Sequence, residues 1–61
     1  IQLIQVCLEL YRDNESREVG GLREAMRFFK MDKGILITLN QEDKIRTEEG
    51  WIDVIPVHQF V

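Results

Sequence analysis

The chain has 61 residues, 44% of them hydrophobic and 31% charged, and its formal net charge is −3, as in one soluble domain without repeats or low-complexity tracts. One cysteine and one histidine exclude a disulfide framework and a four-ligand zinc site, so we expect no metal in this segment. No apolar run reaches the roughly 18 residues that cross a bilayer and no signal-like stretch is present, so we expect a cytoplasmic protein without a membrane partner.

The first ten residues, IQLIQVCLEL, predict a strand that begins directly at Ile1. Side chains two residues apart share a face of a strand, so Gln5, Cys7 and Glu9 form a polar row on one face. The opposite face carries the aliphatic residues Ile4, Val6, Leu8 and Leu10. A polar row on a buried strand is either held by hydrogen bonds or belongs to a functional site.

The next segment predicts an amphipathic helix from about Ser16 to Lys30. Its apolar stripe recurs at spacings of three and four residues and consists of Val19, Leu22, Met26 and Phe29. We expect Asn14 or Asp13 to cap the start of the helix, and Gly34 to end it in the left-handed conformation.

Gly20 and Gly21 lie inside this helical pattern, where each glycine costs about 1 kcal/mol relative to alanine. Close approach of the helix to a strand or to a second helix would explain them. The alternative is a helix that is loosened or that starts late.

Three basic residues of the helix, Arg23, Arg27 and Lys30, are spaced to lie on one side and are candidates for binding nucleic acid. A chain of net negative charge would need such a local patch to attract a polyanion. A charged stripe opposite an apolar one is, however, the ordinary solvated face of a helix, with Glu24 close enough to pair with Arg27. We favour this second interpretation.

After the helix, Ile35 to Leu39 (ILITL) predicts a strand covered on both faces. KIRT and WIDVIPV then predict a hairpin around EEG, in which Gly50 accepts a positive φ. We expect Pro56 to end the pairing, and VHQFV to form a helical turn or a docked tail. The result is an α/β fold of β-α-β-β(-α) order, with a right-handed crossover between two parallel strands.

This succession resembles the second half of the core of the PD-(D/E)XK, or restriction-endonuclease-like, superfamily. The segments LIQVCLEL, REVGGLREAM, GILITL and IDVIPVHQF are more closely similar to the C-terminal segment of a group of uncharacterised bacterial and archaeal AAA-type ATPases. The resemblance covers nearly the whole chain. It implies that residues 1–61 are a single domain or domain fragment, the C-terminal part of a larger ATPase-associated protein whose ATPase activity lies upstream.

In active members of the superfamily, the motif strand carries a metal-binding acid and, two residues later, a lysine that helps to activate water. The resemblance places Gln5 at the position of the acid and Cys7 at that of the lysine. A glutamine oxygen is a poorer Mg²⁺ ligand than a carboxylate, and cysteine lacks the charge and reach of lysine. We therefore expect no catalytic residue here, and interpret Gln5 and Cys7 as interior residues at vestigial motif positions.

The resemblance implies a non-catalytic accessory domain of an AAA-type ATPase, which docks nucleic acid or partner subunits. One alternative is a nuclease completed by an upstream aspartate, and Mg²⁺ is a cofactor only in that case. A second alternative is an oligomerisation module.

Two further positions have chemical alternatives. A nucleophilic Cys7 would need a base, and nothing in the sequence brings His58 to it, so we expect a buried, inert thiol. Trp51 and Phe60 are expected in the core, although Trp51 opens a hairpin beside a turn, where it could be a partly exposed interface anchor.

One helix covers only one face of the predicted sheet. The other face would expose an apolar patch larger than monomers usually tolerate, so missing sequence or another chain is expected to cover it. We expect a homo-oligomer, most simply a twofold dimer in which sheet edges or uncovered faces meet.

Overall fold

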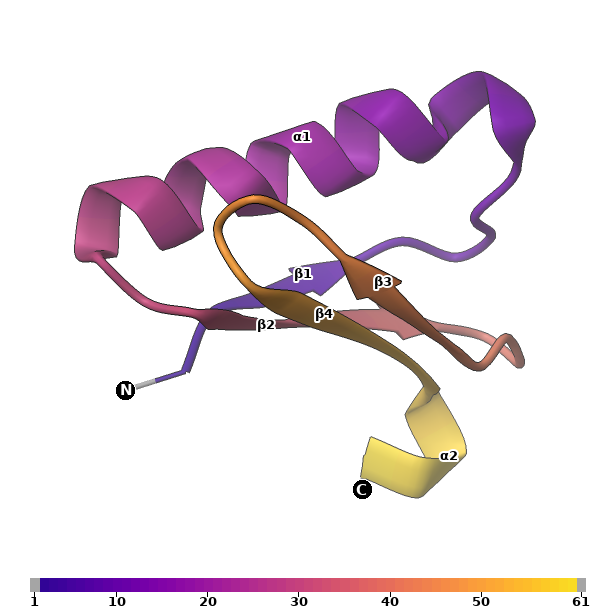
Figure 1. Cartoon of the computed structure of the whole chain (residues 1–61). Coiled ribbons are helices and arrows are strands. Elements are labelled where there is room, and N and C mark those ends of the chain that lie inside the picture. Colours follow the sequence, from indigo (N-terminus) through magenta and orange to yellow (C-terminus); the bar gives the residue numbers. More distant parts are fainter. Residues whose placement is uncertain (1, 61) are drawn as a thin grey trace.

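The computed structural model describes residues 2–60, which form a four-stranded mixed sheet and two helices. In chain order the elements are β1 (Ile4–Val6), α1 (Arg12–Phe29), β2 (Lys33–Thr38), β3 (Asp43–Arg46), β4 (Trp51–Pro56) and α2 (Val57–Phe60) (Figure 1). The α/β class is confirmed. The structure has one strand more than the β-α-β-β(-α) order, because both arms of the expected hairpin pair as strands.

The strands lie in the order β1-β2-β4-β3. β1 and β2 are parallel neighbours, as predicted, and β4 is parallel to β2 and antiparallel to β3. The second arm of the hairpin therefore lies inside the sheet, and the first arm lies at its edge. Ile52 and Val54 of β4 are almost fully buried, whereas β3 has the sequence DKIR, whose charges suit an edge strand.

α1 begins at Arg12, one turn before the expected Ser16. Asn14 lies in the first turn and not ahead of it, so the prediction that Asn14 or Asp13 precedes the helix as its cap is wrong. The side-chain oxygen of Asn14 accepts a hydrogen bond from the backbone N–H of Tyr11 at 2.8 Å. Asn14 thus closes the start of the helix from inside it, as the third residue of a capping box does.

α1 ends at Phe29 and is capped by Lys30, which takes the left-handed conformation with φ of 56°. The backbone N–H of Met31 donates to the carbonyl of Met26 at 2.8 Å. The prediction that Gly34 ends the helix is wrong. Gly34 lies in β2 under α1, where an added Cβ would be 3.0 Å from Cδ2 of Leu22. Its missing side chain therefore lets the helix approach the strand closely.

Gly20 and Gly21 do not have this role among the described residues. Both lie inside α1, and an added Cβ at either position would meet nothing within 4 Å. The close approach that the sequence suggested for them occurs at Gly34 instead, and α1 starts early, not late.

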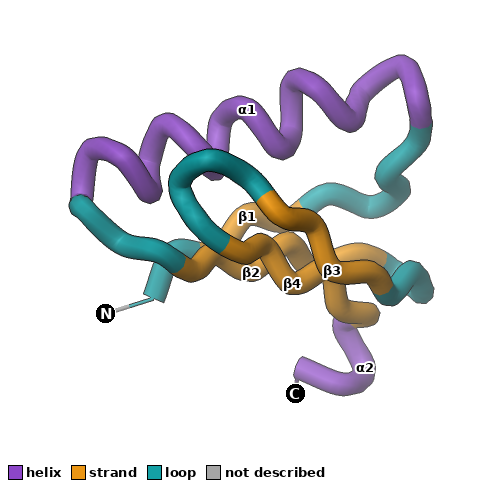
Figure 2. The backbone as a smooth tube through the Cα atoms, viewed as in Figure 1, coloured by secondary structure: helices purple, strands orange, loops and turns teal. Residues whose placement is uncertain are grey.

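The core lies between α1 and one face of the sheet, as the layers in Figure 2 show. Its buried members are Cys7, Val19, Leu22, Met26, Leu36, Ile52 and Val54. Phe29, predicted to belong to the apolar stripe, is 50% exposed, because it is the last residue of the helix. Leu10, assigned to the opposite face of the first strand, packs against this core.

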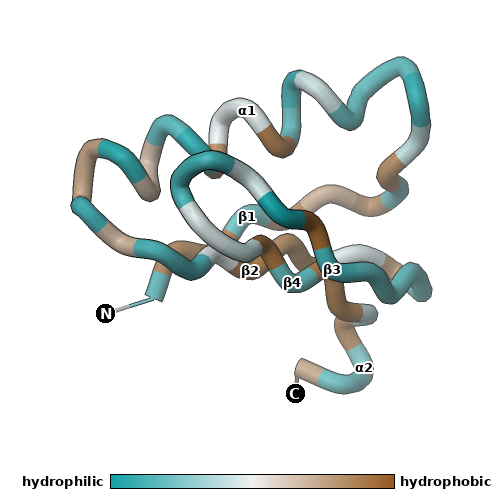
Figure 3. The backbone as a smooth tube through the Cα atoms, in the orientation of Figure 1, coloured by the Kyte–Doolittle hydropathy of each residue, from teal (hydrophilic) through white to brown (hydrophobic). Residues whose placement is uncertain are grey.

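The face of the sheet opposite α1, called the open face below, is only partly covered within residues 2–60. The single turn of α2 lies on this side and contacts β2 and β4 (Figure 1). Ile37 of β2 is buried, but Ile4 and Val6 of β1 are 42% and 66% exposed. Hydrophobic residues lie along β2 and β4, whereas the start of α1 is hydrophilic (Figure 3).

Candidate functional site

The strand predicted over the first ten residues is shorter in the structure, because β1 ends at Val6, so only Gln5 of the predicted polar row lies in it. Gln5 and Cys7 are both held by internal hydrogen bonds. Gln5 is half-buried, and its side-chain Nε2 donates to Oε1 of Glu18 in α1 at 2.9 Å. The amide at the motif position of the acid therefore links the first strand to the helix.

Cys7 is 8% exposed and belongs to the core. Its Sγ donates to the carbonyl of Glu9 at 3.2 Å and accepts from Nδ2 of Asn14 at 3.6 Å. The same Asn14 nitrogen donates to the Glu9 carbonyl at 2.8 Å. The thiol is thus part of the network that ties β1 to the start of α1, and α2, which carries His58, lies on the other side of the sheet (Figure 1).

Gln41 is a structural residue that sequence reasoning missed. Its Oε1 accepts from the backbone N–H of Leu10 at 2.6 Å, and its Nε2 donates to the Leu10 carbonyl at 2.7 Å. Its own backbone N–H donates to Oγ1 of the buried Thr38 at 2.9 Å. Nothing in the polar turn NQED distinguishes this glutamine, because the contact joins segments 31 residues apart.

Two of the three basic candidates are paired with an acid. Nε of Arg23 lies 2.6 Å from Oε1 of Glu49, and Nη2 of Arg27 lies 3.0 Å from Oε2 of the same residue. Arg23 also reaches the exposed Glu48 at 3.4 Å. Arg23 and Arg27 therefore link α1 to the turn between β3 and β4. The sequence had suggested Glu24 as the partner of Arg27, but its partner is Glu49.

Glu49 has a lowered pKa of about 2, chiefly because of the hydrogen bond from Arg23 and then that from Arg27. Its side chain is only 12% exposed. The carboxylate also raises the pKa of Arg23. Glu49, together with Glu48, therefore offsets much of the positive charge that Arg23 and Arg27 would present to a phosphate.

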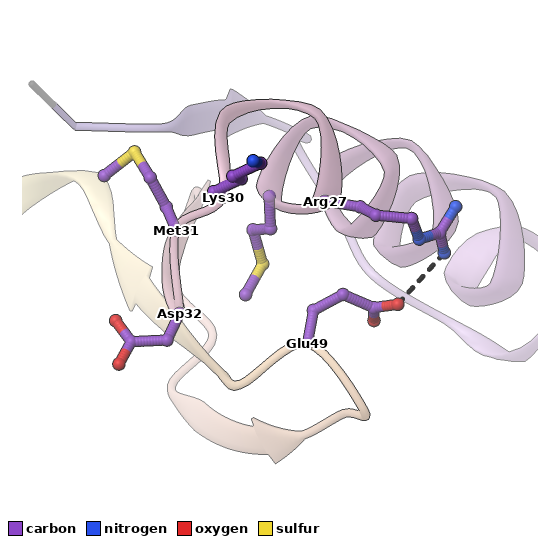
Figure 4. Close-up of a pocket in the computed structure, with 6 residues that line it drawn as sticks. Arg27, Lys30, Met31, Asp32 and Glu49 are labelled. Carbon is purple, nitrogen blue, oxygen red and sulfur yellow. Dashed lines mark hydrogen bonds and ion pairs between the residues drawn. The ribbon is translucent and has the colours of Figure 1, made fainter.

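Lys30, the third candidate, lies beside a surface pocket at the end of α1 (Figure 4). The pocket is lined by Met26, Arg27, Lys30, Met31, Asp32 and Glu49. Two basic and two acidic side chains thus balance there. This mixed lining does not favour an anion over a cation.

Trp51 is at one corner of the open face. The strand register places Lys33 of β2 and Arg46 of β3 on either side of it. Cζ of Arg46 and Nζ of Lys44 lie 5.1 and 5.7 Å from the ring centroid, within the range of cation–π interactions. Trp51 is 41% exposed, so the prediction that it belongs to the core is wrong. Its partial exposure is consistent with the alternative of an interface anchor.

Further exposed hydrophobic residues lie just after β1 and in α2. Leu8, just beyond β1, is 67% exposed, and Ile4 and Val6 of the strand are 42% and 66% exposed. Phe60 of α2, expected in the core, is 41% exposed. The open face therefore has an aliphatic edge at β1 and a basic, aromatic corner at β3 and β4.

Within residues 2–60, no group of three histidine, cysteine or acidic side chains is arranged to hold a metal ion. No helix in that range is long and apolar enough to cross a membrane. No known protein family, curated protein or solved structure matches the chain significantly.

Proposed function

We propose that this chain is a non-catalytic accessory domain that docks a partner subunit through its sheet. The observation that carries the proposal is the exposure of three aliphatic residues in and just after β1: Ile4, Val6 and Leu8 are 42%, 66% and 67% exposed. Single exposed aliphatic residues are ordinary, but several exposed within one short segment are typical of an interaction surface.

The contacts of β1 support the non-catalytic part of the proposal. Gln5 and Cys7, at the motif positions of the acid and the lysine, are bonded to Glu18 and Asn14. A lysine at position 7 would bring its charge into the core, which is costly without a partner. The strand therefore holds α1 in place, and no side chain of the pair is presented to a substrate.

A partner subunit is favoured over nucleic acid because of the arginine contacts. Arg23 and Arg27 are both bonded to Glu49, which leaves Lys30 as the remaining member of the predicted basic stripe. One exposed lysine of this stripe gives little electrostatic attraction to a polyanion. At the basic corner by Trp51, Lys44 is likewise paired with an acid, Asp53, at 3.9 Å.

The resemblance of LIQVCLEL, GILITL and IDVIPVHQF to the C-terminal segment of AAA-type ATPases supports a place in such an enzyme. In that setting the domain joins subunits of the ATP-driven assembly. Under the alternative of an oligomerisation module, the same surface binds a second copy of the chain.

Sedimentation equilibrium at micromolar concentration tests the docking. We expect a mass of at least two chains, because association covers the exposed aliphatic residues. A folded protein that remains a monomer throughout this range would contradict the proposal.

A cleavage assay tests the non-catalytic part. With Mg²⁺ or Mn²⁺ present, we expect the purified chain to leave single- and double-stranded DNA and RNA intact. Metal-dependent cleavage that disappears in Gln5→Ala would favour the nuclease alternative.

A further inference from the structure

The two edges of the sheet differ in charge. Three of the four residues of β3 are charged, namely Asp43, Lys44 and Arg46, and charged side chains at an edge oppose pairing with another strand. Residues 1–8 of the chain contain no charged side chain. β1 is therefore the edge that is open to strand addition.

Within residues 2–60, the backbone of β1 presents unpaired hydrogen-bonding groups at this edge. The carbonyl of Leu3 accepts from the N–H of Ile35 at 2.9 Å, and the N–H of Cys7 donates to the carbonyl of Ile37 at 2.8 Å. These groups point toward β2. Because backbone groups alternate along a strand, Ile4 and Val6 direct their N–H and C=O groups away from β2.

We infer that a second copy of this chain pairs with β1 in antiparallel orientation about Gln5, so that one sheet continues across a twofold axis. Ile4 then exchanges N–H···O=C bonds with the partner's Val6, and Gln5 lies opposite the partner's Gln5 in a non-hydrogen-bonded pair. The inference rests on the proposed function, since it names the partner and the surface that docks it.

The side chains agree with this register. On the open face, the exposed Ile4 and Val6 of one copy lie against Val6 and Ile4 of the other, which covers part of their apolar surface. On the α1 side, Gln5 bonds the charged Glu18, which in turn pairs with Arg17 at 3.7 Å. Their opposite signs limit like-charge repulsion near the axis.

The side of α1 above this edge carries small residues. Glu18, bonded to Gln5, marks the side of α1 that lies above β1. Gly21 and Ala25 follow three and seven residues later, so they lie on the same side of the helix. Helices pack with axes about 8–10 Å apart when the side chains between them are small. The partner's α1 would approach here, which gives Gly21 a role that no contact within the described chain gives it.

Val6→Pro is the first test, because proline removes the outward N–H of Val6 and is tolerated at a strand edge that faces solvent. We expect the variant to keep the far-ultraviolet circular dichroism of the fold and to sediment as a monomer. Val6→Ile is the matched control, because isoleucine is also β-branched, keeps the N–H and keeps the apolar surface. It should remain a dimer.

Cross-linking tests the register independently of proline. In Cys7→Ser, the hydroxyl replaces the thiol between Asn14 and Glu9, and Gln5→Cys is added as the sole cysteine. Opposed residues of a non-hydrogen-bonded pair have Cα atoms about 4.5 Å apart, within the range of a disulfide. Mild oxidation should therefore give a covalent dimer, whereas Lys44→Cys in the same background, on the β3 edge, should stay monomeric on a non-reducing gel.

The outcomes separate the inference from the proposed function. A wild-type dimer that persists in Val6→Pro, or that cross-links at residue 44 and not at residue 5, overturns the pairing through β1 and leaves the docking role intact. A wild-type monomer in sedimentation overturns both. If Val6→Pro does not fold, the cross-linking pair alone decides the register.

Discussion

At the scale of single residues, the partly or fully buried polar side chains find hydrogen-bond partners within the chain. Gln5 bonds Glu18, Cys7 bonds Asn14 and the Glu9 carbonyl, and Gln41 bonds both backbone groups of Leu10. Each bond joins segments that would otherwise leave a buried donor or acceptor unpaired, which is costly. Structural use therefore accounts for the residues that first suggested a site.

Cys7 should resist thiol reagents in the folded protein. It is 8% exposed and is the one cysteine of the chain, so labelling reports this position alone. We expect no reaction in buffer and full reaction in denaturant, because burial keeps the reagent away from the sulfur until the chain unfolds. Rapid labelling in buffer would show that the strand does not pack under α1 as described.

Two glycines should respond to alanine with opposite signs. In Gly34→Ala, the new Cβ would lie 3.0 Å from Leu22 and 3.1 Å from Met26, so we expect a loss of about 1–3 kcal/mol in the free energy of unfolding. In Gly20→Ala, the Cβ meets nothing within 4 Å, so helix propensity should add about 0.5–1 kcal/mol. Urea unfolding of both variants measures the two effects, and a loss of stability in Gly20→Ala would be contrary to the geometry.

At the scale of elements, α1 is fixed at several places along its length. Its start is tied to β1 through Asn14, its middle is close to Gly34 of β2, and its last turns are tied to the β3–β4 turn through Glu49. A long helix on a small sheet otherwise has few contacts, so the ion pairs at Glu49 help to hold the hairpin against it.

Glu49→Gln should remove a pH-dependent part of the stability. The pKa of Glu49 falls from an ordinary 4.5 to about 2 in the folded protein. A lowered folded pKa means that the stabilisation is complete above about 4.5 and is lost as the pH falls through about 2. Wild type and Glu49→Gln should therefore differ most near neutral pH and converge toward pH 2 in thermal unfolding.

Glu48→Gln is the matched control for that measurement. Glu48 is 91% exposed and lies 3.4 Å from Arg23, so its loss should change stability little at any pH, as for most surface pairs. If both variants shifted equally, the bonds from Arg23 and Arg27 to Glu49 would not be the source of the pH dependence.

At the scale of the whole molecule, the sheet is closed on one face and open on the other. α1 covers one face completely enough to bury Leu36 and Ile52, while α2 is a single turn that leaves β1 exposed. A chain of 61 residues has little core to hold it together, so covering the open face adds a large share of the buried apolar area.

The melting temperature of the wild type should therefore rise with protein concentration, because association stabilises the folded state by mass action. Circular dichroism melts across the micromolar range measure this, and Val6→Pro should show no such dependence. A concentration-independent melting temperature for the wild type would mean that folding and association are not coupled.

The elements that could be predicted are those with local signals. The apolar spacing of Val19, Leu22 and Met26 indicates a helix, and the hairpin with Gly50 at positive φ follows from turn chemistry. The boundaries of α1 could not be predicted, because Asn14 acts through β1 and Lys30 takes the left-handed conformation without being a glycine. For the site, the sequence selected Arg23 and Arg27 but not their partner, since Glu49 is distant in the chain.

The sequence by itself determined the α/β class, the parallel pairing of the first two strands and the presence of an incompletely covered sheet face, because periodicity and turn residues act over a few positions. Only the tertiary structure decided that β4 lies inside the sheet, that Glu49 binds both arginines and that β1 is the uncharged edge. These depend on which segments pack together, and packing is chosen by the burial of the whole chain at once and not by any local pattern.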